Sequence, residues 1–158
     1  MTDSQKNFMR QAIQLAKDGM LSGAGGPFGC VIVKDGKIVG QGSNRVLTTQ
    51  DPTAHAEVVA IRDACKNLNH FQLEGCELYA SCEPCPMCLG AIYWARPDRV
   101  FFACTKEDAA DIGFDDELIY REIEIKPSKR KIPMENLLRE ESLEAFELWK
   151  EKGDKALY

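Results

Sequence analysis

Two short motifs contain the residues of this chain that are best suited to chemistry. His55 and Glu57 stand two residues apart where an amphipathic helix is expected to begin, and Cys85 and Cys88 stand three apart at the start of another. A spacing of three turns both sulfur atoms to the same side of a helix. The partial positive charge of a helix N-terminus favours the thiolate form that a metal ion requires. If the two helix starts meet, the histidine and the two cysteines form a metal site.

One histidine and two cysteines are a ligand set typical of zinc. Three protein ligands leave the fourth position open, and water at such a position has a pKa of about 7. Because Glu57 does not share a helix face with His55, we interpret it as the group that moves protons between this water and a substrate nitrogen. His-x-Glu followed by Pro-Cys-x-x-Cys is the signature of zinc nucleobase deaminases. We therefore predict one catalytic Zn²⁺ per subunit.

Cys82 offers a competing interpretation, because it extends the cysteine pattern at the same spacing. As a fourth ligand it would close the site and make it a structural zinc module without chemistry. Cys82 precedes Glu83-Pro84, outside the helical turn, so we predict a packed thiol instead. His70 is expected at the surface. The remaining cysteines lie in apolar patterns that predict core packing: Cys30, Cys65, Cys76 and Cys104.

Length and composition restrict the class of protein. The chain has 158 residues and a mass of 17.7 kDa, which predicts a single domain over residues 1–158. Its first residues are polar, unlike a signal peptide, and no apolar run is long enough for a membrane span. These features predict a cytoplasmic protein, in which seven reduced cysteines indicate metal binding, catalysis or core packing rather than disulfides. The net charge of -5 argues against a nucleic-acid partner, although Lys126–Lys131 is locally basic.

Hydrophobic periodicity predicts the elements that must position the two motifs. Helices are expected over residues 4–21, 54–67, 87–95, near 115–121 and at 141–152. The stripe of the second helix consists of Val58, Ile61, Cys65 and Leu68. Strands are expected over residues 28–33, 37–42, 76–80 and 99–103, the first two joined by a hairpin turn at Asp35-Gly36. This order of elements indicates an α/β fold whose mixed sheet has helices on both faces.

The sequence resembles the cytidine-deaminase-like superfamily, and within it the small bacterial guanine deaminases. The two zinc motifs are shared across the superfamily, whereas Gly113–Asp116 and the tail ending in Tyr158 are narrower features. The resemblance implies a three-layer α/β/α fold with a mixed five-stranded sheet. It also implies zinc on His55, Cys85 and Cys88, and hydrolysis of guanine to xanthine and ammonia.

The resemblance further implies a role for several residues around a purine. Glu57 would be the proton shuttle and Asp116 a second proton carrier near the leaving amine. The implied substrate contacts are the stacking rings Phe28 and Trp94, the amide of Asn44, and Ala54 and Tyr158. From the residues alone, a turn is the better interpretation of Asn44, Asp116 is consistent with a helix cap, and the aromatic rings are equally consistent with core packing.

In the family, the C-terminal segment, here 141–158, closes over the active site and is exchanged between the subunits of a domain-swapped homodimer. Two enzymatic alternatives stay open. tRNA adenosine deaminases share the motifs and would use Lys126–Lys131 as an RNA contact. Guanosine deaminases cannot be separated by motif alone, and the structural zinc module is the non-enzymatic alternative.

Overall fold

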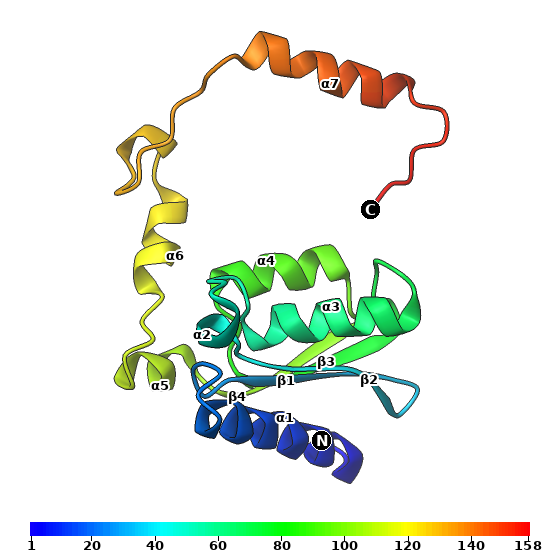
Figure 1. Cartoon of the computed structure of the whole chain (residues 1–158), viewed down its shortest axis with the longest axis vertical. Helices are drawn as coiled ribbons and strands as arrows, with labels where there is room; N and C mark the ends of the chain where they lie inside the picture. Colours follow the sequence, from blue (N-terminus) through cyan, green and yellow to red (C-terminus); the bar gives the residue numbers. More distant parts are fainter. The chain divides into compact units, whose positions relative to one another are not determined.

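The computed structural model describes residues 1–158, which divide into two compact units, Met1–Asp116 and Glu117–Tyr158. The first unit consists of one sheet with helices on both faces, and the second consists of helices and connecting segments (Figure 1). No helix in either unit combines the length and the apolar character that a membrane span requires.

The sheet of the first unit is mixed and has the strand order β2-β1-β3-β4. Its central strand β1 is antiparallel to both neighbours, whereas β3 and β4 are parallel. Asp35 and Gly36 join β1 to β2 with φ angles of 50° and 73°. Positive φ at both central residues is the geometry of a tight hairpin turn, so the hairpin prediction is confirmed. The strands are β1 Gly29–Lys34, β2 Lys37–Ser43, β3 Cys76–Cys82 and β4 Arg99–Cys104.

The sheet has four strands, so the expectation of five was wrong. After β4 the chain turns at once into helix α5, Lys106–Asp111. Thr105 and Asp108 form a capping box at its start, in which each side chain accepts a hydrogen bond from the backbone N–H of the other. This satisfies N–H groups that a helix N-terminus leaves unpaired. The residues after β4 are therefore committed to helix rather than to another strand.

The two faces of the sheet carry separate apolar cores. Helix α1, Asp3–Leu21, covers one face, and α3, Ala56–Leu68, and α4, Pro86–Ala95, cover the other (Figure 1). Alternate residues of β1 divide between the cores, Cys30 and Ile32 toward α3 and α4, and Val31 and Val33 toward α1. The three predicted helices are confirmed, with ends shifted by one or two residues. A short helix α2, Val46–Thr49, follows β2.

Helix α3 packs on β2 through small residues. Its fully buried apolar side chains are Ala56, Ala60 and Ala64, whereas the predicted stripe of Val58, Ile61, Cys65 and Leu68 is only partly buried. A Cβ on Gly40 would lie 2.5 Å from the Cβ of Ala64, and one on Gly42 would lie 2.6 Å from the Ala56 carbonyl oxygen. The helix therefore lies directly on the strand, with no room for larger side chains at these positions.

The second unit contains α6, Glu117–Glu124, a 3-10 turn η1, Pro127–Lys129, and α7, Arg139–Glu151. Arg130 Nε donates a hydrogen bond to the Glu122 carbonyl oxygen at 2.8 Å and so stabilises the end of α6. None of the residues in these helices is buried. Both helices predicted for this part of the chain are present. The single domain over residues 1–158 and the closing role of 141–158 stay predictions.

Replacing Gly40 tests the close approach of α3 to β2. We expect Gly40→Ala to lower the free energy of unfolding by about 1–3 kcal/mol, because the added methyl group meets Ala64. Gly90 is the control, since it lies in α4 with nothing within 4 Å of an added Cβ, and Gly90→Ala should raise stability by up to about 1 kcal/mol. Urea unfolding measures both, and equal stabilities would contradict the packing described.

Candidate active site

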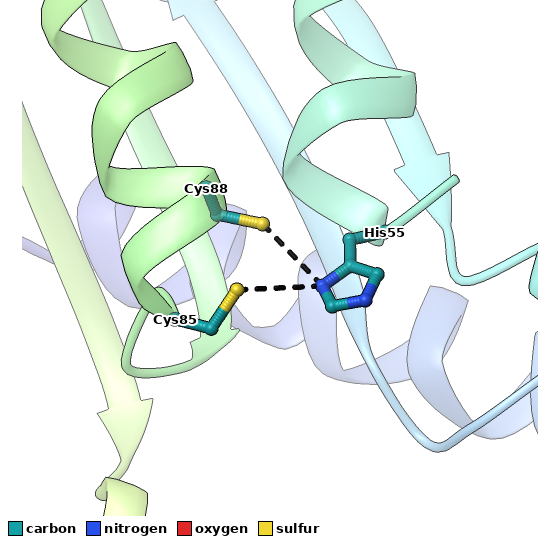
Figure 2. Close-up of side chains that lie close together, drawn as sticks. All are labelled: His55, Cys85 and Cys88. Carbon is teal, nitrogen blue, oxygen red and sulfur yellow. Dashed lines mark hydrogen bonds between the residues drawn. The ribbon is translucent and has the colours of Figure 1, made fainter. Parts of the chain in front are cut away.

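Two helix N-termini meet in the first unit and bring the predicted metal ligands together. His55 is the N-cap residue of α3 and Cys85 that of α4, and neither side chain makes a capping hydrogen bond. Both are therefore available to a ligand. Pro86 occupies the first turn of α4, where its missing N–H has no cost. Cys88 lies in the same turn, and Figure 2 shows both sulfur atoms facing the imidazole ring of His55.

The three donor atoms have the spacing that zinc requires. His55 Nδ1 lies 3.5 Å from Cys85 Sγ and 3.6 Å from Cys88 Sγ, and all three lie within 4.8 Å of one another. Tetrahedral zinc with its usual bond lengths to sulfur and nitrogen places these two atom types about 3.6 Å apart. The donor set therefore fits Zn²⁺ without rearrangement, and Nδ1 is the imidazole atom that binds.

The protonation of the three ligands is coupled. The pKa of Cys85 is lowered to about 4, first because Cys88 donates a hydrogen bond to its sulfur, and also because His55 does. That shared proton and burial raise the pKa of Cys88 far above its ordinary value. The hydrogen bond to Cys85 raises the pKa of His55. These shifts favour a thiolate at Cys85, and a bound cation would take the place of the proton on Cys88.

Glu57 lies beside the donor set rather than within it. Its side chain is 7% exposed, and Oε2 accepts a hydrogen bond from Cys88 Sγ at 3.4 Å. Burial raises the pKa of the carboxyl group above its ordinary value. A raised pKa favours a carboxyl group that can accept a proton and return it. This is the property that a proton shuttle needs.

Cys82 lies outside the metal cluster, as predicted. It is the last residue of β3, and its Sγ donates a hydrogen bond to the Thr105 carbonyl oxygen at 3.4 Å. Burial raises the pKa of this thiol to about 11, which disfavours the thiolate form that zinc binds. The donor group that could hold a metal ion contains His55, Cys85 and Cys88.

The other cysteines follow the predictions only in part. Cys30 and Cys76 are fully buried, and Cys65 is partly buried against the core of α3 and α4. Cys104 is exposed, so its predicted core packing was wrong. It is the last residue of the edge strand β4, where an apolar neighbourhood in sequence does not produce burial. His70 is exposed, as predicted.

Asn44 and Phe28 are adjacent in the first unit. Asn44 N donates a hydrogen bond to the Phe28 carbonyl oxygen at 3.0 Å. The Asn44 side chain is buried, and its Oδ1 accepts a hydrogen bond from Val46 N at 3.2 Å. This local bond is the turn predicted for Asn44, and it leaves Nδ2 as the donor available to a ligand. Ala54 is also buried, and its carbonyl oxygen accepts a hydrogen bond from Arg45 N.

Asp116 is partly buried at the end of the first unit. Its pKa is raised, mainly by burial and then by the negative charge of the Cys85 sulfur. Asp116 therefore lies within electrostatic reach of Cys85, and its role as a second proton carrier stays a prediction.

Comparison with known proteins identifies the class of this site. The family described as the cytidine and deoxycytidylate deaminase zinc-binding region matches residues 2–104. The chain belongs to this deaminase family. Zinc is accordingly its cofactor, which agrees with the donor set found in the structure.

Individual relatives differ in how much of the deaminase they match. A guanine deaminase of Bacillus subtilis (strain 168) is 53% identical over 155 residues, which cover 98% of this chain and 99% of that protein. Its X-ray structure superposes with a TM-score of 0.95 and covers 100% of this chain and 99% of that one, at 52% identity. A tRNA-specific adenosine deaminase of Aquifex aeolicus (strain VF5) is 45% identical over 96 residues, 61% of this chain and 63% of that protein. A guanine deaminase structure from Nitrosomonas europaea gives a TM-score of 0.66 at 31% identity, covering 69% of this chain and 63% of that one.

Trp94, which is expected to contact the substrate, lies away from the metal cluster of the deaminase. Trp94 is 65% exposed near the C-terminal end of α4. At 1.5 Å per residue it lies roughly 13 Å along the helix axis from Cys85. Tyr158 belongs to the second unit. Substrate contacts by Trp94 and Tyr158 stay predictions.

Phe114 is a residue of the deaminase that the sequence analysis left without a role. Its ring packs edge-on against that of Phe28, with centroids 4.9 Å apart and an interplanar angle of 89°. The sequence contains one indication of this contact. Phe114 follows Gly113, whose φ of 94° marks a turn, and it precedes Asp116 by two residues.

Two serine substitutions separate zinc ligands from packed thiols. Cys88→Ser removes a ligand sulfur. We therefore expect a larger loss of zinc affinity than the about 10- to 100-fold that follows removal of a residue that only hydrogen-bonds to a metal ligand. Cys82→Ser should keep about one zinc per chain, because its sulfur donates to a carbonyl oxygen outside the cluster. Metal analysis after dialysis against a chelator measures both. Loss of zinc from Cys82→Ser would revive the closed structural site.

Proposed function

We propose that this deaminase hydrolyses guanine to xanthine and ammonia, as part of purine breakdown or salvage. One observation carries the proposal. The 53% identity to the Bacillus subtilis guanine deaminase extends over 98% of the chain, whereas the tRNA-specific relative from Aquifex aeolicus matches 61%. The match to the guanine enzyme therefore includes the residues after 104, which lie beyond the zinc-binding region common to the family.

The metal cluster supports hydrolytic chemistry. His55, Cys85 and Cys88 would hold zinc and leave its fourth position to water or substrate. When bound, zinc supplies a Lewis acid that makes water an effective nucleophile near neutral pH. The N-termini of α3 and α4 both point at the cluster, and their partial positive charges stabilise the two thiolates.

Glu57 would move the proton that this reaction must transfer. It takes a proton from the attacking water and delivers it to the ring nitrogen beside C2 of guanine. The water oxygen bonds to C2, which becomes tetrahedral, and the carbon–nitrogen bond to the exocyclic amine then breaks. Burial of Glu57 supports this role, because its raised pKa allows the carboxyl group to return the proton.

Asp116 would protonate the leaving amine, which departs as ammonia, and its carboxylate would then regain a proton from the C2 hydroxyl group as the C2 carbonyl of xanthine forms. Its partial burial and raised pKa favour the protonated form of the carboxyl group more than in a free aspartate. Because Asp116 lies within electrostatic reach of Cys85, it can act beside the zinc rather than at the surface.

Asn44 would distinguish guanine from adenine. Its Oδ1 is occupied by Val46 N, so the side chain offers a donor through Nδ2. Guanine presents the acceptors O6 and N7 along one edge, whereas adenine presents a donor amine in place of O6. A donor directed at the position of O6 would therefore favour guanine. The ring of Phe28 would stack on the base, with Ala54, Trp94 and Tyr158 as further contacts.

The C-terminal segment 141–158 would complete the active site. The side chains of Phe146 and Trp149 are 63% and 40% exposed, an apolar surface that favours burial against another surface. We propose that this segment closes over the pocket within a domain-swapped homodimer. We also propose that the enzyme acts in the cytoplasm, where its seven free cysteines stay reduced.

An assay of ammonia release tests the substrate. The zinc-loaded protein is incubated with guanine, guanosine, adenosine, cytosine and an adenosine-containing tRNA stem-loop. We expect release from guanine, because a match covering 98% of the chain supports that substrate. Release only from the stem-loop or from guanosine would keep the zinc chemistry and overturn the substrate.

Glu57→Gln tests the proton shuttle. The amide has nearly the same shape but cannot carry the proton, so we expect kcat on guanine to fall by about 10²- to 10⁴-fold. Zinc content should stay near one per chain, because Glu57 is not part of the donor set. Metal analysis beside the kinetic assay separates the two effects. Unchanged kcat in this variant would remove the role of Glu57.

Removal of the last residues tests the closing segment. We expect deletion of 155–158 to lower kcat/KM on guanine by at least about tenfold, because bulk water then reaches the site. The melting temperature should change little, since none of these residues is buried. Steady-state kinetics and thermal unfolding of the same preparation measure both. An unchanged rate would exclude this segment from the active site.

A further inference from the structure

Gly26 lies beneath two aromatic rings of the first unit. A Cβ built on Gly26 would lie 2.8 Å from Cζ of Phe114 and 3.0 Å from Cε2 of Phe28. Real Cβ atoms do not approach other carbon atoms so closely. The φ angle of Gly26 is not positive, so glycine is needed here for space rather than for backbone conformation. The two rings therefore pack on the backbone at Gly26 and edge-on against each other.

The segment that carries Phe114 also carries Asp116. Helix α5 ends in a turn in which Gly113 N donates a hydrogen bond to the Ala110 carbonyl oxygen and Phe114 N donates one to that of Ala109. Beyond this turn the chain belongs to no strand of the sheet, and α6 begins at Glu117. The ring of Phe114 thus attaches the segment 113–116 to the loop that precedes β1.

We infer that Phe114 is a positioning residue, which holds Asp116 beside the metal ligands by docking on Phe28 and Gly26. The inference rests on the proposed function, because it gives Phe114 its effect through the proton carried by Asp116. Phe114 itself touches no reacting atom. Phe114 fixes the segment 113–116 to the loop before β1, and Asp116 at the other end of this segment must stay close to Cys85.

The same contact ties the proton carrier to the purine contacts. The Phe28 carbonyl oxygen accepts a hydrogen bond from Asn44 N, so the stacking ring and the amide share one backbone connection. Phe114 packs on that ring and precedes Asp116 by two residues. Asp116 is thus connected, through Phe114 and Phe28, to the backbone that carries Asn44. A displacement of about 1 Å at a reacting group can cost about 10²-fold in rate.

A double-mutant cycle tests whether Phe114 acts through Asp116. We expect Phe114→Ala to lower kcat on guanine by at least about tenfold, with a smaller change in KM. Asp116→Asn should lower kcat by about 100-fold or more. In the Asp116→Asn background, Phe114→Ala should change kcat by less than about twofold, because the group it positions is already lost.

Two further variants control the experiment. Phe71→Ala is the matched control, since Phe71 is 52% exposed, close to the 46% of Phe114, and stacks on His70 away from the loop before β1. It should leave kcat unchanged. Gly26→Ala should lower kcat in the wild-type background but less in Phe114→Ala, where the nearest ring is gone. All variants are compared at equal zinc content.

Hydrogen exchange of the 110–118 peptide measures the anchoring without turnover. Exchange of this peptide should be faster in Phe114→Ala than in the wild-type protein, and unchanged in Phe71→Ala. The inference fails if Phe114→Ala keeps wild-type kcat and exchange, or if it lowers kcat by the same factor with and without Asp116. A wild-type protein that releases no ammonia from guanine would instead refute the proposed function, and the exchange experiment would then decide whether Phe114 anchors the segment.

Discussion

The active site depends on how closely helix α3 approaches strand β2. His55 begins α3 and the two cysteines begin α4, yet their donor atoms must come within about 3.6 Å of one another to share a tetrahedral metal. Alanine side chains on α3 against Gly40 and Gly42 permit this. Larger residues at that contact would lift the whole helix, because interiors are close-packed and transmit displacement. The smallest side chains of the core thus determine the geometry of the metal site.

The same approach buries Glu57, and burial is what makes this carboxyl group useful. Moving a carboxylate away from water is unfavourable unless it finds partners. Here Cys88 donates a hydrogen bond while its thiol is protonated, and a bound cation, which would replace that proton, would supply a strong favourable charge instead. The raised pKa of Glu57 therefore reflects a compromise between the stability of the fold and proton transfer. Stability would favour an apolar residue at this position, whereas proton transfer requires an ionisable one.

Local geometry explains which features the sequence could predict. The Asp35-Gly36 turn and the two ligand motifs depend on residues a few positions apart, and all three formed as expected. Long-range packing was not predictable in the same way. Apolar periodicity predicted that the large residues of α3 form its buried face. The helix instead buries its alanines, because larger side chains do not fit against the glycines of β2. Cys104 lies in an apolar run but ends an edge strand, and no pattern along the chain indicates which strand is at the edge. The contact between Phe114 and Phe28 joins distant segments and was missed for the same reason.

Asn44 shows how turn chemistry and recognition can use a single side chain. A free asparagine amide offers both a donor and an acceptor, and so does not discriminate between purine edges that differ in polarity. The hydrogen bond from Val46 N occupies one lone pair of Oδ1, and the backbone of Gly25 packs so closely on Oδ1 that an added Cβ would lie 2.0 Å from it. The amide is thereby held in one orientation, with Nδ2 left as its donor. In the proposed function, a contact that looks purely structural in the sequence would thus orient the group that recognises the base.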